Sequence, residues 1–144
     1  PAFYPQDWHP PVTPHFQKDG GPWPVHCVAD TWGARFVDGL DVTGPVIRKG
    51  VQGEDGYSAF SVRDPEGGQT GSTGLDGQLR ELGVRRIVVA GLATDYCVRE
   101  TALDGRALGF EVVVRGALVR AVDLQPGDGQ RALEAMAAAG ATVA

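Results

Sequence analysis

One stretch of the chain places a cysteine where a strand and a helix could make it reactive. Cys97 follows the apolar run Arg86–Ala90, which predicts a buried parallel strand. Apolar residues at helical spacing then predict a helix from Asp95 or Tyr96 to Leu108, with the cysteine in its first turn. Backbone N–H groups and the helix dipole favour a thiolate there, so this cysteine is a candidate nucleophile. A small apolar residue packed beneath the helix is an equal alternative on this stretch alone.

A carboxylate and two histidines form a second candidate group. Asp7 and His9 are two residues apart, so in an extended chain their side chains lie on the same side. His26 follows a long proline-rich loop, Pro10–Pro24. One oxygen and two nitrogens suit a mononuclear metal site that leaves positions for water or substrate. Each residue also has an ordinary alternative as a turn cap, a loop residue or a core histidine, and His15 is interpreted as loop packing.

The segment Gly44–Gly50 predicts a short strand whose last residue is Lys49. If that strand runs parallel to Arg86–Ala90, the lysine reaches the same sheet edge as Cys97, where its ammonium would stabilise a thiolate. The alternative is a solvated surface lysine, the usual environment of this residue type. Its position at the end of a strand favours a part in the site.

Strands alternate with helices along the chain, which predicts the α/β class with a mostly parallel sheet. Thr94 or Asp95 is the expected cap of the helix that carries the cysteine. The first residues are expected to form a poor strand because of Pro5. Further elements are expected: a helix capped by Ser72 or Thr73 that runs through Leu82, a strand at Phe110–Val114, a helix from Pro126 or Gly127 onward and a strand at Thr142–Val143.

The composition excludes several classes of function. The 144 residues, 42% of them hydrophobic, fit a single domain spanning 1–144. The net charge of −5 and scattered arginines argue against nucleic acid as a partner. No apolar run could cross a membrane and no signal segment opens the chain, so we expect a cytoplasmic location and no membrane partner. Cys27 and Cys97 are far apart, which indicates reduced thiols and no disulfide framework.

Taken in order, these residues resemble the isochorismatase-like cysteine hydrolase family, in its nicotinamide-hydrolysing branch. The resemblance covers nearly the whole chain and implies a Rossmann-like three-layer α/β/α fold. Four segments carry it: Asp7-Trp8-His9-Pro10, Gly21-Pro22-Trp23-Pro24-Val25-His26-Cys27, Lys49-Gly50 followed by Tyr57-Ser58-Ala59-Phe60, and Gly91-Leu92-Ala93-Thr94-Asp95-Tyr96-Cys97-Val98.

The resemblance implies a role for each candidate residue. A divalent metal would be held by Asp7, His9 and His26, with zinc expected first and iron or manganese as alternatives. Cys97 would attack an amide carbon, and Lys49 would support its thiolate.

The same resemblance implies how the substrate would be held. The backbone N–H groups of Ala93 and Cys97 would form the oxyanion hole, arranged through a cis peptide bond between Leu92 and Ala93. Trp23 and Tyr96 would form aromatic walls around a flat ring.

One part of the family pattern has no match in this sequence. The family's acid/base aspartate ends an N-terminal central strand, and no apolar run precedes Asp7. The resemblance therefore implies that the fold lacks the family's first strand and that the domain is N-terminally incomplete. Because the members of such a triad act as a unit, a chain without that aspartate would lose much of its rate.

The expected function is hydrolysis of nicotinamide to nicotinate and ammonia through a thioester on Cys97. One alternative is another cysteine hydrolase of the family that acts on a carbamoyl compound or other small amide. The other is a non-catalytic fragment that binds a metal, a ligand or a partner. Isochorismate hydrolases lack the cysteine, and the absence of Cys-x-x-Cys disfavours a redox thiol protein. Family members commonly self-associate, so we expect a homo-oligomer.

Overall fold

The computed structural model describes residues 1–144, and the chain forms two compact units. The first unit comprises Pro1–Gly56 and Ser61–Thr73, and the second comprises Tyr57–Phe60 and Gly74–Ala144. Parallel strand pairs occur in both units and helices lie between the strands of the second. The α/β class with mostly parallel pairing is therefore confirmed.

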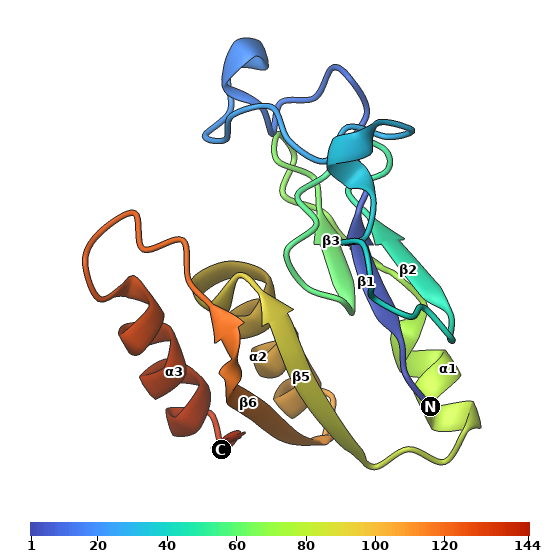
Figure 1. The fold of residues 1–144 in the computed structure, drawn as a ribbon, viewed down its shortest axis with the longest axis vertical. Coiled ribbons are helices and arrows are strands. Elements are labelled where there is room, and N and C mark those ends of the chain that lie inside the picture. The colour runs from blue at the N-terminus through green and yellow to red at the C-terminus, as the bar shows by residue number, and fades with distance from the viewer. The chain divides into compact units, whose positions relative to one another are not determined.

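The first unit is built on a parallel pair of strands. β1 (Tyr4–Asp7) and β2 (Val46–Lys49) lie side by side (Figure 1). Their register pairs Asp7 with Lys49, so both strands end at the same edge. The expected strand that ends on this lysine is confirmed.

Pro5 does not prevent β1 from forming, so the expectation of a poor strand is wrong. The N–H groups of Tyr4 and Trp8 donate to carbonyl oxygens of Pro45 and Lys49, at 2.9 and 3.0 Å. The backbone N–H groups of even-numbered residues in this strand therefore point toward β2, whereas an N–H at position 5 would point away from it. The missing N–H of Pro5 is therefore not needed by the ladder.

The rest of the first unit consists of short elements. An antiparallel hairpin joins β3 (Ser61–Arg63) and β4 (Thr70–Ser72), and single 3-10 turns lie at η1 (Gln17–Asp19) and η2 (Trp32–Ala34). The hairpin was not expected, because its sequence is polar and glycine-rich and lacks the alternation of a half-buried strand.

The second unit has a three-stranded parallel sheet whose strand order follows the sequence. Its helix α2 packs against β5 and β6 and also against α3 (Figure 1). The rings of Phe60 and Phe110 stack in the core. No helix of the chain combines the length and the apolar character of a membrane span. The elements are β5 (Arg86–Leu92), β6 (Glu111–Arg120) and β7 (Thr142–Val143), with α1 (Leu75–Glu81), α2 (Arg99–Ala107) and α3 (Asp128–Ala138).

Strand β5 is less buried than its apolar sequence predicted. Ile87 faces α2, where its side chain lies against Gly105, whereas Val88 points to the opposite face and is 62% exposed. Because α2 and α3 contact each other, both lie on one side of this sheet within the unit. One face of β5 therefore remains open there.

The helix after β5 begins with a π-helical turn, η3 (Thr94–Val98), and α2 continues it. The cap residue is Ala93, so the prediction of a side-chain cap from Thr94 or Asp95 is wrong. The Asp95 carboxylate instead accepts hydrogen bonds from two backbone N–H groups that follow β6. This contact ties the turn to the end of the neighbouring strand.

Candidate functional site

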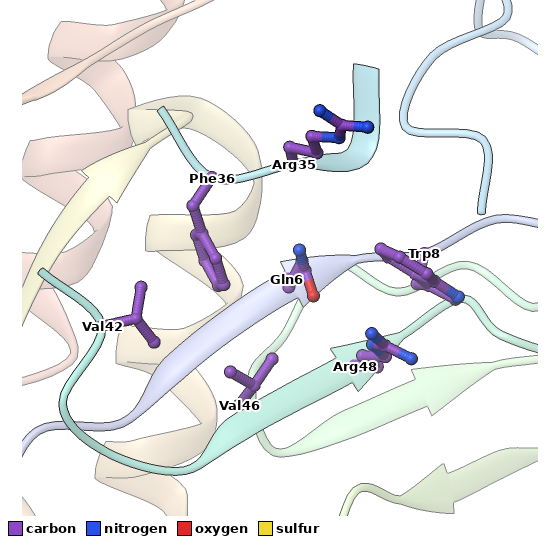
Figure 2. Close-up of a pocket in the computed structure, with 7 residues that line it drawn as sticks. All are labelled: Gln6, Trp8, Arg35, Phe36, Val42, Val46 and Arg48. Carbon is purple, nitrogen blue, oxygen red and sulfur yellow. The ribbon is translucent and has the colours of Figure 1, made fainter. Parts of the chain in front are cut away.

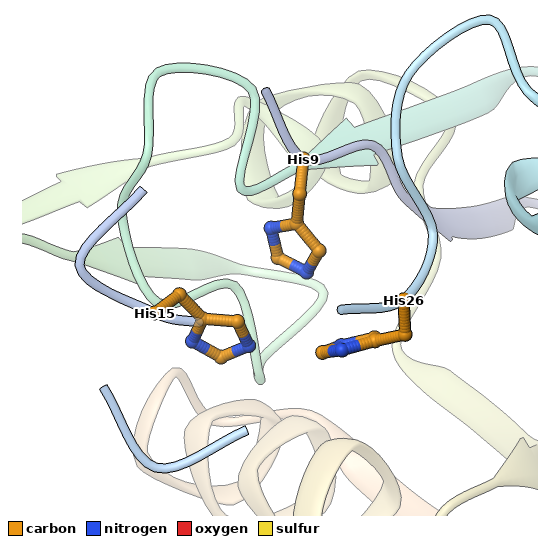
Figure 3. Close-up of side chains that lie close together, drawn as sticks. All are labelled: His9, His15 and His26. Carbon is orange, nitrogen blue, oxygen red and sulfur yellow. The ribbon is translucent and has the colours of Figure 1, made fainter. Parts of the chain in front are cut away.

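Three histidines of the first unit come together (Figure 3). The candidate ligand atoms of His9, His15 and His26 all lie within 4.8 Å of one another. The rings of His9 and His15 stack with centroids 4.6 Å apart, and His26 approaches them at 5.0 and 5.3 Å. His9 and His26 were among the predicted ligands, whereas His15 had been interpreted as loop packing. Sequence reasoning thus missed one imidazole of the cluster.

Backbone hydrogen bonds hold His9 beside the segment that carries His26. The His9 N–H donates to the Cys27 carbonyl at 2.9 Å, and the N–H of Ala29 donates to the His9 carbonyl at 2.8 Å. His9 thereby forms a parallel bridge with Val28, just beyond the end of β1. This bridge brings the two histidines together although a long loop separates them in sequence.

The intervening loop closes on itself and positions His15. Phe16 and Trp23 form a bridge, and the Trp23 N–H donates to the His15 carbonyl at 3.2 Å. The Phe16 side chain is fully buried, and its ring meets the rings of His9 and His26 edge-on at 5.6 and 5.5 Å. An apolar ring therefore backs the histidine cluster.

The hydrogen bonds of two histidines decide which ring nitrogen can bind a cation. His15 Nδ1 lies 2.6 Å from a carboxylate oxygen of Asp55, and His26 Nδ1 lies 2.7 Å from the Pro24 carbonyl. Both oxygens can only accept, so both Nδ1 atoms carry the proton. Each Nε2 then offers a lone pair, and a neutral imidazole nitrogen of this kind is a common ligand of divalent metals. The residues present therefore fit a bound metal.

His9 is held neutral by its surroundings. Burial lowers the pKa of His9 from 6.5 to about 4, and the neighbouring His15 and His26 contribute to the shift, while the charge of Asp7 opposes it. Its Nδ1 is buried and has no hydrogen-bond partner. A neutral imidazole is the form that coordinates metals, so His9 is ready to act as a ligand near neutral pH.

Asp7 and Lys49 form an ion pair at the ends of β1 and β2. Lys49 Nζ donates to Asp7 Oδ1 at 2.5 Å and also to the Gly56 carbonyl. The lysine is buried, which excludes the alternative of a solvated surface side chain. In the structure the Asp7 carboxylate is paired with the Lys49 ammonium. The role of Asp7 as a metal ligand stays a prediction.

Cys97 lies in the second unit, inside the helical turn that follows β5. The peptide bond between Leu92 and Ala93 is cis, which confirms what the family resemblance implied. The N–H groups of Tyr96 and Val98 both donate to the Ala93 carbonyl and close the turn around the cysteine. The thiol is half-buried and forms no disulfide. The oxyanion hole at Ala93 and Cys97 stays a prediction.

The two predicted aromatic walls lie in different units. Tyr96 has Tyr57 beside it, with ring centroids 5.9 Å apart, and burial raises the pKa of Tyr96, so its phenol stays neutral. Trp23 lies beside His15 and His26, at 6.3 and 6.2 Å between ring centroids. Contact of either ring with a substrate is a prediction.

An open pocket of about 690 Å³ is lined by Gln6 and Trp8, on the face of β1 opposite to that of Asp7 (Figure 2). The guanidinium of Arg48 stacks over the Trp8 ring at 3.7 Å, and Gln6 donates to the Ala34 carbonyl. Because alternate residues of a strand face opposite sides, Gln6 and Trp8 point away from the face of Asp7. No predicted site residue lines this pocket.

Comparisons with known proteins identify relatives of the whole chain. The family model described as Isochorismatase domain matches residues 1–144. A nicotinamidase of Escherichia coli (strain K12) is 40% identical and aligns with 96% of this chain and 71% of its own length. The structure of PnC1 from L. infantum in complex with nicotinate has a TM-score of 0.89 at 40% identity, over 99% of this chain and 70% of that one. The pyrazinamidase of Pyrococcus horikoshii in complex with zinc has a TM-score of 0.84 at 40% identity, over 99% and 73%.

Proposed function

The chain belongs to the isochorismatase family, and on that premise we propose that it hydrolyses nicotinamide to nicotinate and ammonia. The observation that carries the proposal is the position of Cys97, in a helical turn that directly follows the carboxyl end of β5. The relatives support the substrate, since one is a nicotinamidase and another was solved with nicotinate.

The proposed reaction uses Cys97 as the nucleophile. Its thiolate attacks the amide carbon, a C–S bond forms, and the C–N bond breaks as the nitrogen takes up a proton and leaves as ammonia. Water then attacks the thioester, which releases nicotinate and returns the thiolate. Backbone N–H groups of Ala93 and Cys97 are the proposed donors to the oxyanion in both steps. The family's acid/base aspartate is not assigned to a residue of this chain.

Lys49 is proposed as the cation that stabilises the thiolate. Its burial and its bonds to Asp7 and the Gly56 carbonyl support this role, because they hold the side chain in one orientation as an ammonium. A fixed positive charge lowers the pKa of a nearby thiol.

We propose that His9, His15 and His26 hold a divalent metal, with Asp7 as a further ligand. Such a metal would supply a Lewis acid for water or for the ring nitrogen of the substrate. The zinc complex of the Pyrococcus relative supports zinc as the first candidate, with iron and manganese as alternatives. The proposal is supported by the candidate ligand atoms of the three histidines, which lie within 4.8 Å of one another.

Trp23 and Tyr96 are proposed to hold the pyridine ring. Both offer flat apolar surfaces, and offset stacking between aromatic rings is worth about 0.5–1.5 kcal/mol. Self-association and a cytoplasmic location remain predictions.

The test is ammonia release from nicotinamide by the full product of the gene, purified and loaded with zinc. We expect turnover by the wild type, about a thousandfold loss in Cys97→Ser, and unchanged turnover in the matched variant Cys27→Ser. A loaded wild type that releases no ammonia from nicotinamide overturns the substrate assignment. Release from other small amides in the same assay would assign it to another branch of the family.

A further inference from the structure

A carboxylate outside the predicted site lies against one histidine of the cluster. Asp55 Oδ1 is 2.6 Å from His15 Nδ1, and the exposed fractions of the two side chains are 21% and 3%. Because a carboxylate only accepts, the bond fixes the proton of His15 on Nδ1. The Nε2 lone pair then points toward His9 and His26 (Figure 3).

The backbone of Asp55 is itself anchored. Its N–H donates to the Arg63 carbonyl at 2.7 Å, and the N–H of Arg63 donates to the Asp55 carbonyl at 2.9 Å. These two bonds form an isolated antiparallel bridge between Asp55 and Arg63, the last residue of β3. The carboxylate therefore projects from a position fixed by main-chain hydrogen bonds.

A second connection holds His15 against the same segment. Thr13 Oγ1 donates to the Gly53 carbonyl at 2.8 Å and accepts from the His15 N–H at 3.1 Å. The loop that carries His15 is thus joined to residues 53–55 at two points, one through Thr13 and one through Asp55. Both the position and the ring orientation of His15 depend on this segment.

The three histidines differ in what their Nδ1 atoms contact. His26 Nδ1 meets a neutral carbonyl and His9 Nδ1 has no partner, whereas His15 Nδ1 meets a charged carboxylate. A carboxylate behind a metal-binding imidazole orients the ring and increases its basicity as a ligand. Of the three imidazoles, His15 is therefore the one whose Nδ1 has the strongest hydrogen-bond acceptor.

We propose that Asp55 is a positioning residue that holds His15 in its Nδ1–H tautomer, and thereby sets the affinity of the centre for a divalent metal. The inference rests on the metal site of the proposed function and adds a residue that acts on it through His15. Asp55 is not expected to touch the metal or the substrate.

The first test is zinc affinity of the full protein, measured by competition with a chromophoric chelator. We expect Asp55→Ala to bind zinc about 10- to 100-fold more weakly than the wild type. Asp55→Asn, which retains a neutral acceptor, should fall between them. The matched control Asp38→Asn removes an exposed carboxylate of the same unit and should stay within about twofold of the wild type.

The second test begins with the wild type, so its first readout does not depend on the folding of a variant. Two-bond nitrogen–proton NMR spectra of the metal-free wild type should show His15 as the Nδ1–H tautomer, and in Asp55→Ala the two tautomers should mix. An Nε2–H tautomer in the wild type, equal zinc affinity in Asp55→Ala, or no zinc binding by the wild type each overturns the inference.

These outcomes are separate from those of the proposed function. If Asp55 controls zinc affinity but nicotinamide is not hydrolysed, the positioning role stands and the substrate assignment fails. If nicotinamide is hydrolysed by a zinc enzyme whose affinity is indifferent to Asp55, the positioning role fails alone.

Discussion

Lys49 Nζ donates to Asp7 Oδ1 at a distance of 2.5 Å, and this bond joins the last residues of two paired parallel strands. The two partners are unequally buried, since the lysine side chain is 4% exposed and the aspartate 25%. A carboxylate left alone at this position can be hydrated, whereas a buried ammonium left alone cannot. The loss of Asp7 should therefore cost more stability than the loss of Lys49.

We expect Asp7→Ala to lower the free energy of unfolding by about 3 kcal/mol, and Lys49→Met by about 1 kcal/mol. Urea denaturation of the metal-free protein measures both values. The exposed pair of Lys18 and Asp19 supplies the control, because Lys18→Met should change stability by less than about 1 kcal/mol. Equal losses from Asp7→Ala and Lys49→Met would contradict the asymmetry.

Gly50 allows the close approach of the His9 ring. It has a φ of +73°, and a Cβ at this position would overlap His9 Nδ1 and lie 3.3 Å from the Glu54 carbonyl oxygen. Gly50→Ala should therefore lower the free energy of unfolding by about 3 kcal/mol, the sum of left-handed strain and overpacking. It should also weaken zinc binding, because the ring must move.

The matched control is Gly39→Ala, in the same unit. Gly39 has a φ of +89°, and a Cβ added there would have nothing within 4 Å, so the variant carries backbone strain alone. We expect a loss of about 1 kcal/mol and unchanged zinc affinity. If the two alanine variants bind zinc equally well, the ring of His9 tolerates displacement and the prediction is wrong.

The low pKa of His9 makes the stability of the metal-free protein depend on pH. The unfolded chain binds a proton at this residue below about 6.5, whereas the folded chain binds it only below about 4. Stability should therefore fall as the pH drops from 6.5 to 4, by up to about 3 kcal/mol from this group. Denaturation curves across that range for the wild type and His9→Gln measure it, and identical slopes would exclude His9 as the source.

Cys97 should react faster than Cys27 although both thiols are half-buried. A thiol pKa lowered by one unit raises the thiolate fraction at pH 7 about tenfold. We expect iodoacetamide to modify Cys97 about tenfold faster than Cys27 in the metal-free protein, and Lys49→Met to remove most of the difference. Mass spectrometry of the peptides gives both rates, and equal slow rates would indicate an inert thiol.

Asp95 holds the turn that carries the nucleophile. Its two carboxylate oxygens accept from the N–H groups of Val122 and Asp123 at 3.0 and 2.9 Å, and its side chain is buried. Asp95→Ala leaves both donors without this acceptor and should cost about 3 kcal/mol. Hydrogen exchange should speed up at residues 122 and 123, whereas the exposed control Glu81→Ala should leave it unchanged.

Local sequence patterns predicted the elements that local interactions build. The strand at residues 86–90, the strand that ends on Lys49 and the helical turn around Cys97 are all present. Their signals were β-branched runs, a strand-terminal charge and helical spacing, which are contained within a few residues. The cis peptide bond came from the family resemblance alone.

Distant contacts account for what was missed. His15 is held by Asp55, which contacts its ring, and by Thr13, which accepts from its N–H and donates to the Gly53 carbonyl. Asp55 and Gly53 lie 40 residues from His15 and Thr13 respectively, so no local pattern could reveal these contacts. Asp95 was expected to cap its own helix, but its acceptors serve N–H groups 27 and 28 residues later. A polar side chain with two candidate partners cannot be assigned to one of them until the chain is folded.

The buried ring of Phe16 also bears on how the metal centre would be handled in the laboratory. With this ring against them, His9 and His26 have little room to swing apart when no ion is present. We therefore expect removal of the metal by a chelator to be reversible, in contrast to zinc fingers, which unfold when their metal is removed. One preparation could be emptied and then loaded in turn with zinc, iron or manganese.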